Sequence, residues 1–476
     1  MARTRSNSSL ADDLMVELVR AGPVPLHRQI EASLRDAIRA GRLRPGTSLP
    51  PSRVVAGDLG VSRGVVVEAY QQLVAEGYLT SRPGGYTQVA SGAAPAPARK
   101  AVVPAPSPPV LKIDFGYGRA DVSHFPRAAW LRSLRTVLTE APSDRFGYLS
   151  GHGMPELRVA LADYLNRARG TAATPDSVVI TNGYAQGITL VIRALAAAGA
   201  RRIVVEDPSP DDDAQPLARA AGLDVVGVPV GDAGICVDLL DRTPADAAVL
   251  TPSHQWPTGG VLSADARAGV LRWAARYGAM VVEDDYDAEY RYDRAPVGAM
   301  QGLDPDRVIY AGTVSKTLAP GLRIGWLVLP RHLVDAVAAA KRLADRGSPA
   351  LDQLAFADFL SRGEFDRHLR RMRPLYRARR DALLAALTAR TPELEVVGVA
   401  AGQHLVAWLP DDLDESTVVT TAAERGVGVY GVGPYRLNGS GRGGLIFGYA
   451  TLSERAMGEG VAMLAEAIEA VRRSSR

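Results

Sequence analysis

The sequence predicts two domains of different class: a small helical N-terminal module ending in a β-hairpin, and a large α/β body with a mostly parallel sheet. Three observations support this. A Pro/Ala-rich stretch interrupts the chain at residues 91–110, three short helical patterns and a hairpin pattern precede it, and apolar strands alternate with amphipathic helices after it. The length of 476 residues also exceeds one ordinary domain.

The composition is that of an ordinary globular protein. Hydrophobic residues make up 47% and charged residues 22%, which excludes a disordered, collagen-like or coiled-coil chain. No stretch approaches the roughly 18 apolar residues of a membrane span, and no signal peptide is expected at the N-terminus. The single cysteine, Cys236, cannot form an internal disulfide, which favours the cytoplasm.

Residues 91–110 read SGAAPAPARKAVVPAPSPPV and contain six prolines and six alanines. Such a segment lacks large apolar groups and favours extended conformations, so it predicts a semi-rigid linker. A long surface loop inside one domain is the alternative. The predicted boundaries are a tail at 1–23, a module at 24–90, the linker at 91–111 and a body at 112–476, with a smaller α+β subdomain from about residue 340.

The N-terminal module carries the whole net charge of +3. Its first helix is predicted by apolar residues every four positions from Leu26 to Ile38. Ser52 is expected to cap a second helix that stops at Gly60, and Ser62 a third. Two short helices joined by a tight turn form a helix-turn-helix, and residues 78–89 predict a hairpin wing.

These motifs resemble the winged helix-turn-helix of the GntR family of bacterial regulators, through PLHRQI, GRLRPGTSLPPSR and LGVSRG. The resemblance implies binding to double-stranded operator DNA, because arginine reads guanine edges and a helix N-terminus holds phosphate. By position, the residues expected to meet DNA are Ser52, Arg53, Ser62, Arg63, Gly64, Arg82 and Gly84. A helix-turn-helix used only for packing is the alternative, and Val67 stands where some members carry a further arginine.

Lysine is rare in this chain, which suggests that the few lysines present have specific roles. Among 55 basic residues only four are lysine: Lys100, Lys112, Lys316 and Lys341. Only a lysine amine can form an imine. Lys316 lies in GTVSKTLAPGLRIGW with Thr313, Ser315 and Arg323, a set that suits a phosphorylated aldehyde.

A second motif, VVEDDYDAEY, follows an apolar strand and contains Asp284. A carboxylate there could pair with a pyridinium nitrogen. Read alone, the motif could equally be a metal site or a solvated acidic loop; with Lys316 present, no metal site is expected.

Together the body's motifs resemble the fold-type I aminotransferases, which use pyridoxal 5'-phosphate, over about residues 113–470. The resemblance implies that Lys316 forms the Schiff base, Asp284 binds the pyridine nitrogen, and Tyr286 bonds the ring oxygen, with His254 as a further ring-oxygen contact. Gly183, Tyr184, Thr313, Ser315 and Arg323 would surround the phosphate. Tyr148 would reach the phosphate of a neighbouring subunit, which implies a homodimer.

Four substitutions depart from that pattern. Trp256 replaces the usual asparagine of the NPTG motif. Pro210 replaces an aromatic residue that stacks on the cofactor ring, and Tyr184 is a possible substitute for that aromatic residue. Asp212 stands where a GABA-responsive member carries an effector-binding arginine. Ile446 replaces an arginine that binds substrate carboxylate, although Arg442 is near enough in sequence to compensate. We therefore expect ordinary α-amino acids to bind poorly.

A GntR-like module joined to an aminotransferase-like body resembles the MocR/GabR-like subfamily of transcription regulators. The resemblance implies a cytoplasmic, homodimeric regulator that senses pyridoxal phosphate or an amino compound forming an imine with it. One alternative is an active aminotransferase with an accessory DNA-binding domain. Another is a DNA-binding protein whose body has lost the cofactor and only dimerises.

Overall fold

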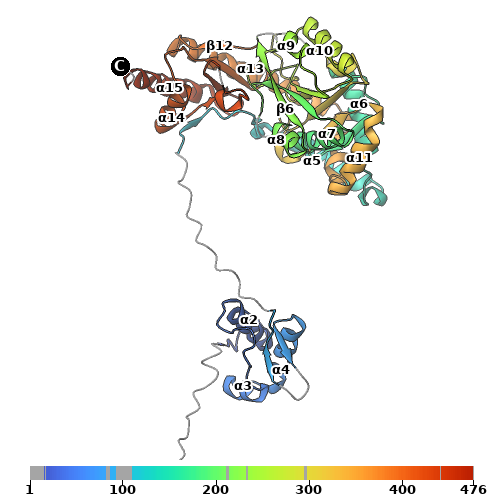
Figure 1. Cartoon of the computed structure of the whole chain (residues 1–476), viewed down its shortest axis with the longest axis vertical. Coiled ribbons are helices and arrows are strands. Elements are labelled where there is room, and N and C mark those ends of the chain that lie inside the picture. The colour runs from blue at the N-terminus through green and yellow to red at the C-terminus, as the bar shows by residue number, and fades with distance from the viewer. Residues whose placement is uncertain are drawn as a thin grey trace, which may run out of the picture. The chain divides into compact units, whose positions relative to one another are not determined.

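The computed structural model describes residues 16, 18–81, 86–92, 110–210, 214–231, 234–293, 297–439 and 441–474. The chain divides into two compact units, Met1–Ser107 and Pro108–Arg476, which are described separately (Figure 1). The predicted linker at 91–111, including Lys100, and the N-terminal tail at 1–23 fall largely outside the described residues. No described helix is long and apolar enough to cross a membrane.

The N-terminal unit is a three-helix module with a two-stranded antiparallel hairpin, as the sequence patterns predict. Its elements are α2 (Leu26–Arg39), α3 (Ser52–Leu59), α4 (Arg63–Ala75), β1 (Leu79–Ser81) and β2 (Thr87–Val89). Its core includes Ile30 and Leu34 of α2 and Leu73 of α4, none more than 1% exposed.

Two helix starts in this unit differ in detail from the expected caps. The expectation that Ser52 caps the second helix is wrong, because Pro51 holds the N-cap position and Ser52 is the first helical residue. Ser62 does occupy the N-cap position of α4, with extended backbone angles, but its side chain makes no cap hydrogen bond. Gly60 ends α3 in the left-handed conformation, φ 59°, which glycine adopts without steric cost.

The large unit is built on an eight-stranded sheet of order β4-β11-β10-β9-β8-β5-β6-β7. Five neighbouring strands, β6, β5, β8, β9 and β10, run parallel, while β11 and β7 are antiparallel to their neighbours. The strands are β4 (Val178–Thr181), β5 (Arg202–Asp207), β6 (Asp224–Gly231), β7 (Gly234–Ile235), β8 (Ala247–Leu250), β9 (Met280–Asp285), β10 (Val308–Thr313) and β11 (Gly325–Val328).

Helices cover both faces of this sheet, because neighbouring residues on a strand point to opposite sides. Val282 of β9 packs into a cluster with α7 (Tyr184–Ala197), α8 (Ala214–Ala220) and α11 (Arg331–Asp345). Val281, one residue earlier, packs with α9 (Val237–Asp241) and α10 (Ala264–Tyr277) on the other face. The predicted mostly parallel sheet between helices is confirmed.

The C-terminal part adds a smaller sheet of order β12-β13-β16-β15, formed by β12 (Glu395–Val397), β13 (His404–Trp408), β15 (Tyr430–Gly431) and β16 (Gly444–Gly448). A short pair joins β3 (Ile113–Asp114) to β14 (Val427–Gly428). The remaining helices are α5 (Arg127–Glu140), α6 (Pro155–Arg169), α12 (Ala350–Ser361), α13 (Glu364–Arg390), α14 (Glu415–Glu424) and α15 (Glu454–Ser474).

Candidate functional site

A cavity of about 240 Å³ lies in the large unit, where residues after the strands of the central sheet meet the start of β13. Ligands of α/β sheets bind at the carboxyl ends of parallel strands. The cavity brings together seven of the ten residues predicted to bind the cofactor. It is lined by Tyr117, Gly118, Tyr184, Ala185, Pro210, Trp256, Asp284, Tyr286, Asp287, Thr313, Ser315, Lys316, Arg323, Gln403 and His404.

The carboxylates of Asp284 and Asp285 at the end of β9 point to opposite faces of the sheet, because side chains alternate along a strand. Asp284 lines the cavity, whereas Asp285 is buried on the opposite side and forms an ion pair of 2.6 Å with Arg169. Asp285 also accepts a hydrogen bond of 2.8 Å from the Tyr310 hydroxyl. Arg169 therefore neutralises Asp285, Tyr310 adds a hydrogen bond, and Asp284 is the carboxylate of the two that lines the cavity.

Lys316 follows β10 and brings its amine to the cavity. Its Nζ donates a hydrogen bond of 2.6 Å to the Gly118 carbonyl, and its own carbonyl accepts one of 2.7 Å from Gln403 Nε2. Gly118 has a φ of 72°, and a Cβ there would lie 3.2 Å from the lysine Nζ. The glycine thus leaves room for the amine and supplies a carbonyl that positions it.

The turn that starts α7 and the turn before β11 form a cradle suited to a phosphate. Gly183 precedes the helix with a φ of 77°, so the first-turn N–H groups of a 14-residue helix face the cavity near Tyr184 and Ala185. Arg323 donates a hydrogen bond of 2.7 Å to the Asn182 carbonyl. A Cβ on Gly183 would lie 2.8 Å from the Arg323 guanidinium, and the positive φ of Gly183 is itself a conformation that favours glycine.

Two hydroxyl groups complete the cradle. Thr313 Oγ1 and Ser315 Oγ lie 2.9 Å apart, and the Ser315 backbone N–H donates to Thr313 Oγ1 at 3.2 Å. Hydroxyls, a guanidinium and a helix N-terminus are donors that suit a dianion. With an amine and a carboxylate in the same cavity, the donor set fits a phosphorylated pyridine aldehyde.

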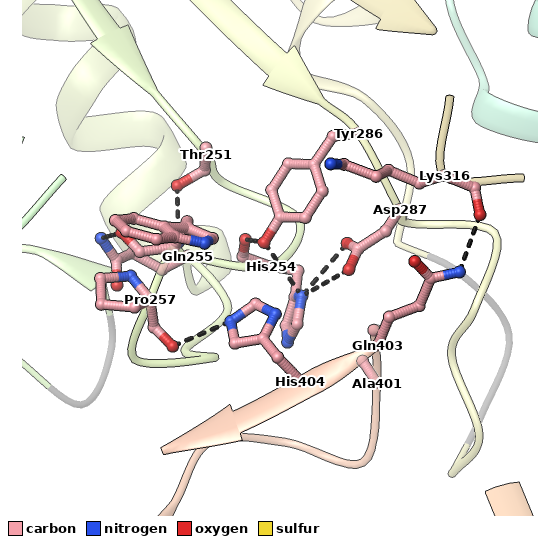
Figure 2. A network of polar contacts seen from close by, with 12 residues as sticks. Thr251, His254, Gln255, Pro257, Tyr286, Asp287, Lys316, Ala401, Gln403 and His404 are labelled. Atoms are coloured by element: carbon pink, nitrogen blue, oxygen red, sulfur yellow. Dashed lines mark hydrogen bonds and ion pairs between the residues drawn. The ribbon is translucent and has the colours of Figure 1, made fainter. Parts of the chain in front are cut away.

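Behind Tyr286 lies a buried network that Figure 2 shows from close by. The Tyr286 hydroxyl donates to the His254 carbonyl at 3.0 Å and lies 3.2 Å from His254 Nδ1. Both carboxylate oxygens of Asp287 lie 3.1 Å from that same Nδ1. Burial raises the pKa of the Tyr286 hydroxyl, so it stays protonated and able to donate.

His404 extends the network from the first residue of β13. Its Nε2 lies 3.0 Å from the Pro257 carbonyl, and burial lowers its pKa to about 4. Ligand atoms of His254, Asp287 and His404 lie within 4.8 Å of one another, an arrangement that could also hold a metal ion. These side chains are, however, hydrogen-bonded to one another or to neighbouring groups, which satisfies a buried polar cluster.

Three predicted cofactor residues do not line the cavity. Gly183 directly precedes the lining residue Tyr184, and His254 is 3% exposed and contacts the lining residue Tyr286. Tyr148 is 97% exposed and lines a separate hollow with Leu149, Arg342 and Arg346. Within a single copy of the chain, Tyr148 is thus not part of the cradle.

The far end of the cavity comprises Tyr117, Trp256, Asp287 and His404, so its lining is aromatic apart from one carboxylate and one imidazole. Trp256 lines the cavity and packs edge-to-face on Tyr435 at 4.6 Å between ring centroids. Ile446 is fully buried on β16 in the same cluster as Trp256. Arg442 does not compensate for the missing arginine, because its side chain contacts the Leu409 carbonyl and Glu395. Among the described lining residues, Arg323 supplies the one guanidinium.

Sequence reasoning missed several lining residues, including Tyr117, Gly118, Asp287, Gln403 and His404. Asp287 carried a usable signal as the last acid of EDDYD. The FGYG motif contains Tyr117 and Gly118, but nothing in it shows that Lys316 lies beside them. Gln403 and His404 have no local signal, because the fold brings them to the cavity from another sheet.

In the N-terminal unit, Arg53, Ser62, Arg63 and Gly64 are exposed at the starts of α3 and α4, and Ser52 is half-buried. Other arginines there are held within the unit: Arg35 pairs with Glu76 at 2.7 Å, and Arg39 contacts the Tyr78 hydroxyl at 3.0 Å. Neither Arg53 nor Arg63 has such a contact to any described residue. Arg82 and Gly84, predicted in the wing, lie outside the described residues, as does Asp212.

Comparison with known proteins divides the chain at the same place. Residues 26–89 match the model of the gntR family of bacterial regulatory proteins, and residues 111–456 match that of aminotransferase class I and II. The probable rhizopine catabolism regulatory protein MocR of Rhizobium meliloti is 36% identical, over 97% of either chain. The HTH-type pyridoxine biosynthesis transcriptional regulator PdxR of Corynebacterium glutamicum is 31% identical, over 96% of this chain and 99% of its own.

A solved aminotransferase shares the fold of the large unit. The α-aminoadipate aminotransferase LysN of Thermus thermophilus, complexed with N-(5'-phosphopyridoxyl)-L-leucine, is 28% identical with a TM-score of 0.68. The match covers 76% of this chain and 93% of that one. The regulators therefore match nearly the whole chain, whereas the enzyme matches about three quarters of it.

Proposed function

Because the chain belongs to the MocR/GabR-like subfamily of GntR-family transcription regulators, we propose that it is a pyridoxal-phosphate-dependent regulator of transcription. Its N-terminal unit binds operator DNA, and its aminotransferase-like unit senses pyridoxal phosphate or an amine that reacts with it. The observation that carries this proposal is the presence of both sites, a cavity with an amine, a carboxylate and phosphate donors and an exposed helix-turn-helix, in one chain. A cytoplasmic location follows from binding to chromosomal DNA.

The residues present assign the cofactor contacts. The bound group supplies an aldehyde that condenses with amines and a ring that withdraws electrons. Lys316 would hold the aldehyde carbon, and Asp284 would accept a charge-assisted hydrogen bond from the protonated pyridine nitrogen. Tyr286 is assigned to the ring oxygen, where its hydroxyl would donate by turning its one proton away from the His254 carbonyl, and Asp287 holds the His254 ring in place. The phosphate contacts are assigned to Gly183, Tyr184, Thr313, Ser315 and Arg323.

The side chains at the far end of the cavity indicate which chemical class of effector the protein would bind. One carboxylate there, Asp287, favours a cation, because Asp284 is assigned to the pyridine nitrogen, and Tyr117 and Trp256 offer aromatic surface. A substrate carboxylate needs a guanidinium, and Arg323 is used in the phosphate cradle. These features support pyridoxal phosphate itself, or an amine without a carboxylate, as the signal.

A homodimer is supported by exposed apolar side chains on the large unit. Leu131 and Leu138 of α5 are 55% and 62% exposed, and Phe146, near Tyr148, is 47% exposed. Such surface on one unit favours association with a partner. In a dimer of two identical chains, Tyr148 is free to contact the phosphate bound by the second copy.

DNA binding is assigned to the two exposed helix starts of the N-terminal unit, with α4 as the helix that reads the major groove. Arg63 supplies a base contact and Arg53 a contact to phosphate or base. The assignment of Arg82 and Gly84 to the wing contact rests on the sequence resemblance.

The test uses the full-length protein and a duplex that it selects from a random pool. We expect Arg63→Ala to weaken binding to the selected duplex about 5- to 150-fold, because one bidentate base contact contributes about 1–3 kcal/mol, with little change for unrelated DNA. Arg455→Ala, on the exposed face of α15, is the matched control and should change nothing. Pyridoxal phosphate or a reactive amine should alter the affinity for the selected duplex.

Two results would overturn the proposal. The first is a wild-type protein that selects no sequence, or binds the same duplex equally well with and without cofactor and amines. The second is sustained transamination at rates typical of enzymes, about 1 s⁻¹ or more, measured by cycling of the cofactor absorbance with an amino donor and a keto acid.

A further inference from the structure

The last turn of α11 places one carboxylate at the centre of four hydrogen bonds. Asp345 accepts from Lys341 Nζ at 2.8 Å, from Gln186 Nε2 at 2.8 Å and from Asn182 Nδ2 at 3.2 Å. Its other oxygen accepts from the Gly347 backbone N–H at 2.8 Å. None of these residues belongs to the cofactor contacts assigned above, and α11 packs beside α7 (Figure 1).

Two of the donors belong to the segment that forms the phosphate cradle. Asn182 directly precedes Gly183, and its backbone N–H donates to Gln186 Oε1 at 2.8 Å. On the other side, Arg323 binds the Asn182 carbonyl at 2.7 Å. The turn is therefore held from two directions, by Asp345 through side chains and by Arg323 through the backbone.

The charge of Asp345 is balanced by a lysine that is buried completely. Lys341 is 0% exposed, and burial lowers the pKa of its amine, because the charged form loses its hydration. Burial opposes ionisation of Asp345, yet hydrogen bonds from Lys341 and Gln186 hold the pKa of its carboxyl below the ordinary value. The Lys341 side chain is 0% and that of Asp345 17% exposed, so the pair is largely shielded from water, and the carboxylate that Lys341 neutralises is the one that Asn182 and Gln186 bind.

We propose that the Lys341–Asp345 pair positions the turn at residues 182–184 so that its amides bind the cofactor's phosphate. The pair thereby sets the preference for a phosphorylated over an unphosphorylated pyridine aldehyde. Lys341 also cancels the negative charge of Asp345, which would otherwise repel the phosphate. These are positioning residues, and the inference rests on the proposed cofactor function.

The experiment titrates the full-length protein separately with pyridoxal phosphate and with pyridoxal, following the absorbance of the bound aldehyde. Asp345→Asn should weaken pyridoxal phosphate binding about tenfold, a loss of about 1.4 kcal/mol, while pyridoxal binding stays within about twofold. Gln186→Met, which removes one amide from the same network, should shift affinity in the same selective direction by less. Asp335→Asn, an exposed residue on the same helix, is the matched control and should leave both affinities unchanged.

The possible outcomes are distinct. Equal losses for both aldehydes would mean that the pair only stabilises the fold, and unchanged binding of pyridoxal phosphate would refute the inference directly. If Asp345→Asn does not fold, as judged by its thermal melt, the ratio measured for Gln186→Met decides. Failure of the wild-type protein to take up either aldehyde would overturn the proposed cofactor function, and the inference with it.

Discussion

The two ends of the cavity differ in where their residues come from and in what they can bind. The cradle end is built from turns at the edge of one sheet, and it offers an amine, a carboxylate, hydroxyls and the guanidinium of Arg323. The far end is built partly by β13 and β16 of a second sheet, with Trp256 against the buried Ile446. An aminotransferase needs charge complementarity at both ends. This chain shows charge complementarity at the cofactor end. The residues that suit the cofactor are therefore present, whereas a site for the carboxylate of an amino acid is not among the described lining residues.

Burial also shifts the pKa values of two ionisable groups, one near each end of the cavity, in opposite directions. Glu206, which lines a small pocket together with Asp284 and Tyr184 of the cradle end, is fully buried, and this raises its pKa to about 7. His404 at the far end is also fully buried, and this lowers its pKa to about 4. Both groups are therefore neutral in slightly acidic solution, because desolvation penalises whichever form is charged.

The largest expected effect concerns the amine at the cradle end. Lys316→Ala should abolish covalent retention of pyridoxal phosphate, because a methyl group cannot condense with an aldehyde. After borohydride reduction, mass spectrometry should find the adduct on wild-type Lys316 and none on the variant. Lys112→Ala, at a lysine whose side chain is 69% exposed, is the control and should retain full labelling. Labelling of Lys316→Ala at another lysine would break the assignment.

A second prediction uses the opposite titrations of Glu206 and His404. For Glu206, the folded carboxyl keeps its proton up to about pH 7 while the unfolded one releases it near the ordinary value of 4.5. Its contribution to stability is therefore complete below pH 4.5 and is lost as the pH rises to 7. For His404, with an ordinary value of 6.5 and a folded value of about 4, the contribution is complete above pH 6.5 and is lost as the pH falls to 4.

Urea unfolding at several pH values tests both signs. Compared with Glu206→Gln, the wild type should lose up to about 3 kcal/mol of unfolding free energy between pH 4.5 and 7, since one pKa unit corresponds to about 1.4 kcal/mol. Compared with His404→Gln, it should lose a similar amount as the pH falls from 6.5 to 4. Glu424→Gln, at an exposed residue of α14, should run parallel to the wild type. Parallel profiles for all three variants would show that neither buried group titrates as stated.

The cradle end could be predicted from sequence because its residues lie in short segments that follow strands. SKTLAPGLR carries Ser315, Lys316 and Arg323 within nine positions, and the strand VIYAG before it fixes where they emerge. The family resemblance drawn from these motifs is confirmed by the family models and by regulators that match nearly the full chain. Strand alternation then explains why Asp284 faces the cavity, whereas Asp285 pairs with Arg169.

The far end could not be predicted because its contacts join distant parts of the chain. Gln403 binds the Lys316 carbonyl across 87 positions, and no local pattern encodes that distance. Lys341 shows a different limit of sequence reasoning. Lysine is rare in this chain, which makes Lys341 unusual in the sequence. Its complete burial and its bond to Asp345, however, depend on how α11 packs against α7.

The smallest expected effect measures the far end directly with two ligands that differ by one carboxylate. Phenethylamine should react with the cofactor-loaded protein at concentrations at least tenfold lower than phenylalanine. The reason is that a carboxylate entering beside Asp287 loses its hydration and meets no guanidinium, since Arg442 is held by Leu409 and Glu395. Free pyridoxal phosphate in solution is the control for intrinsic amine reactivity. If phenylalanine reacted at the same or a lower concentration than phenethylamine, a cation would have to reach the far end, and the contrast between the two ends would no longer hold.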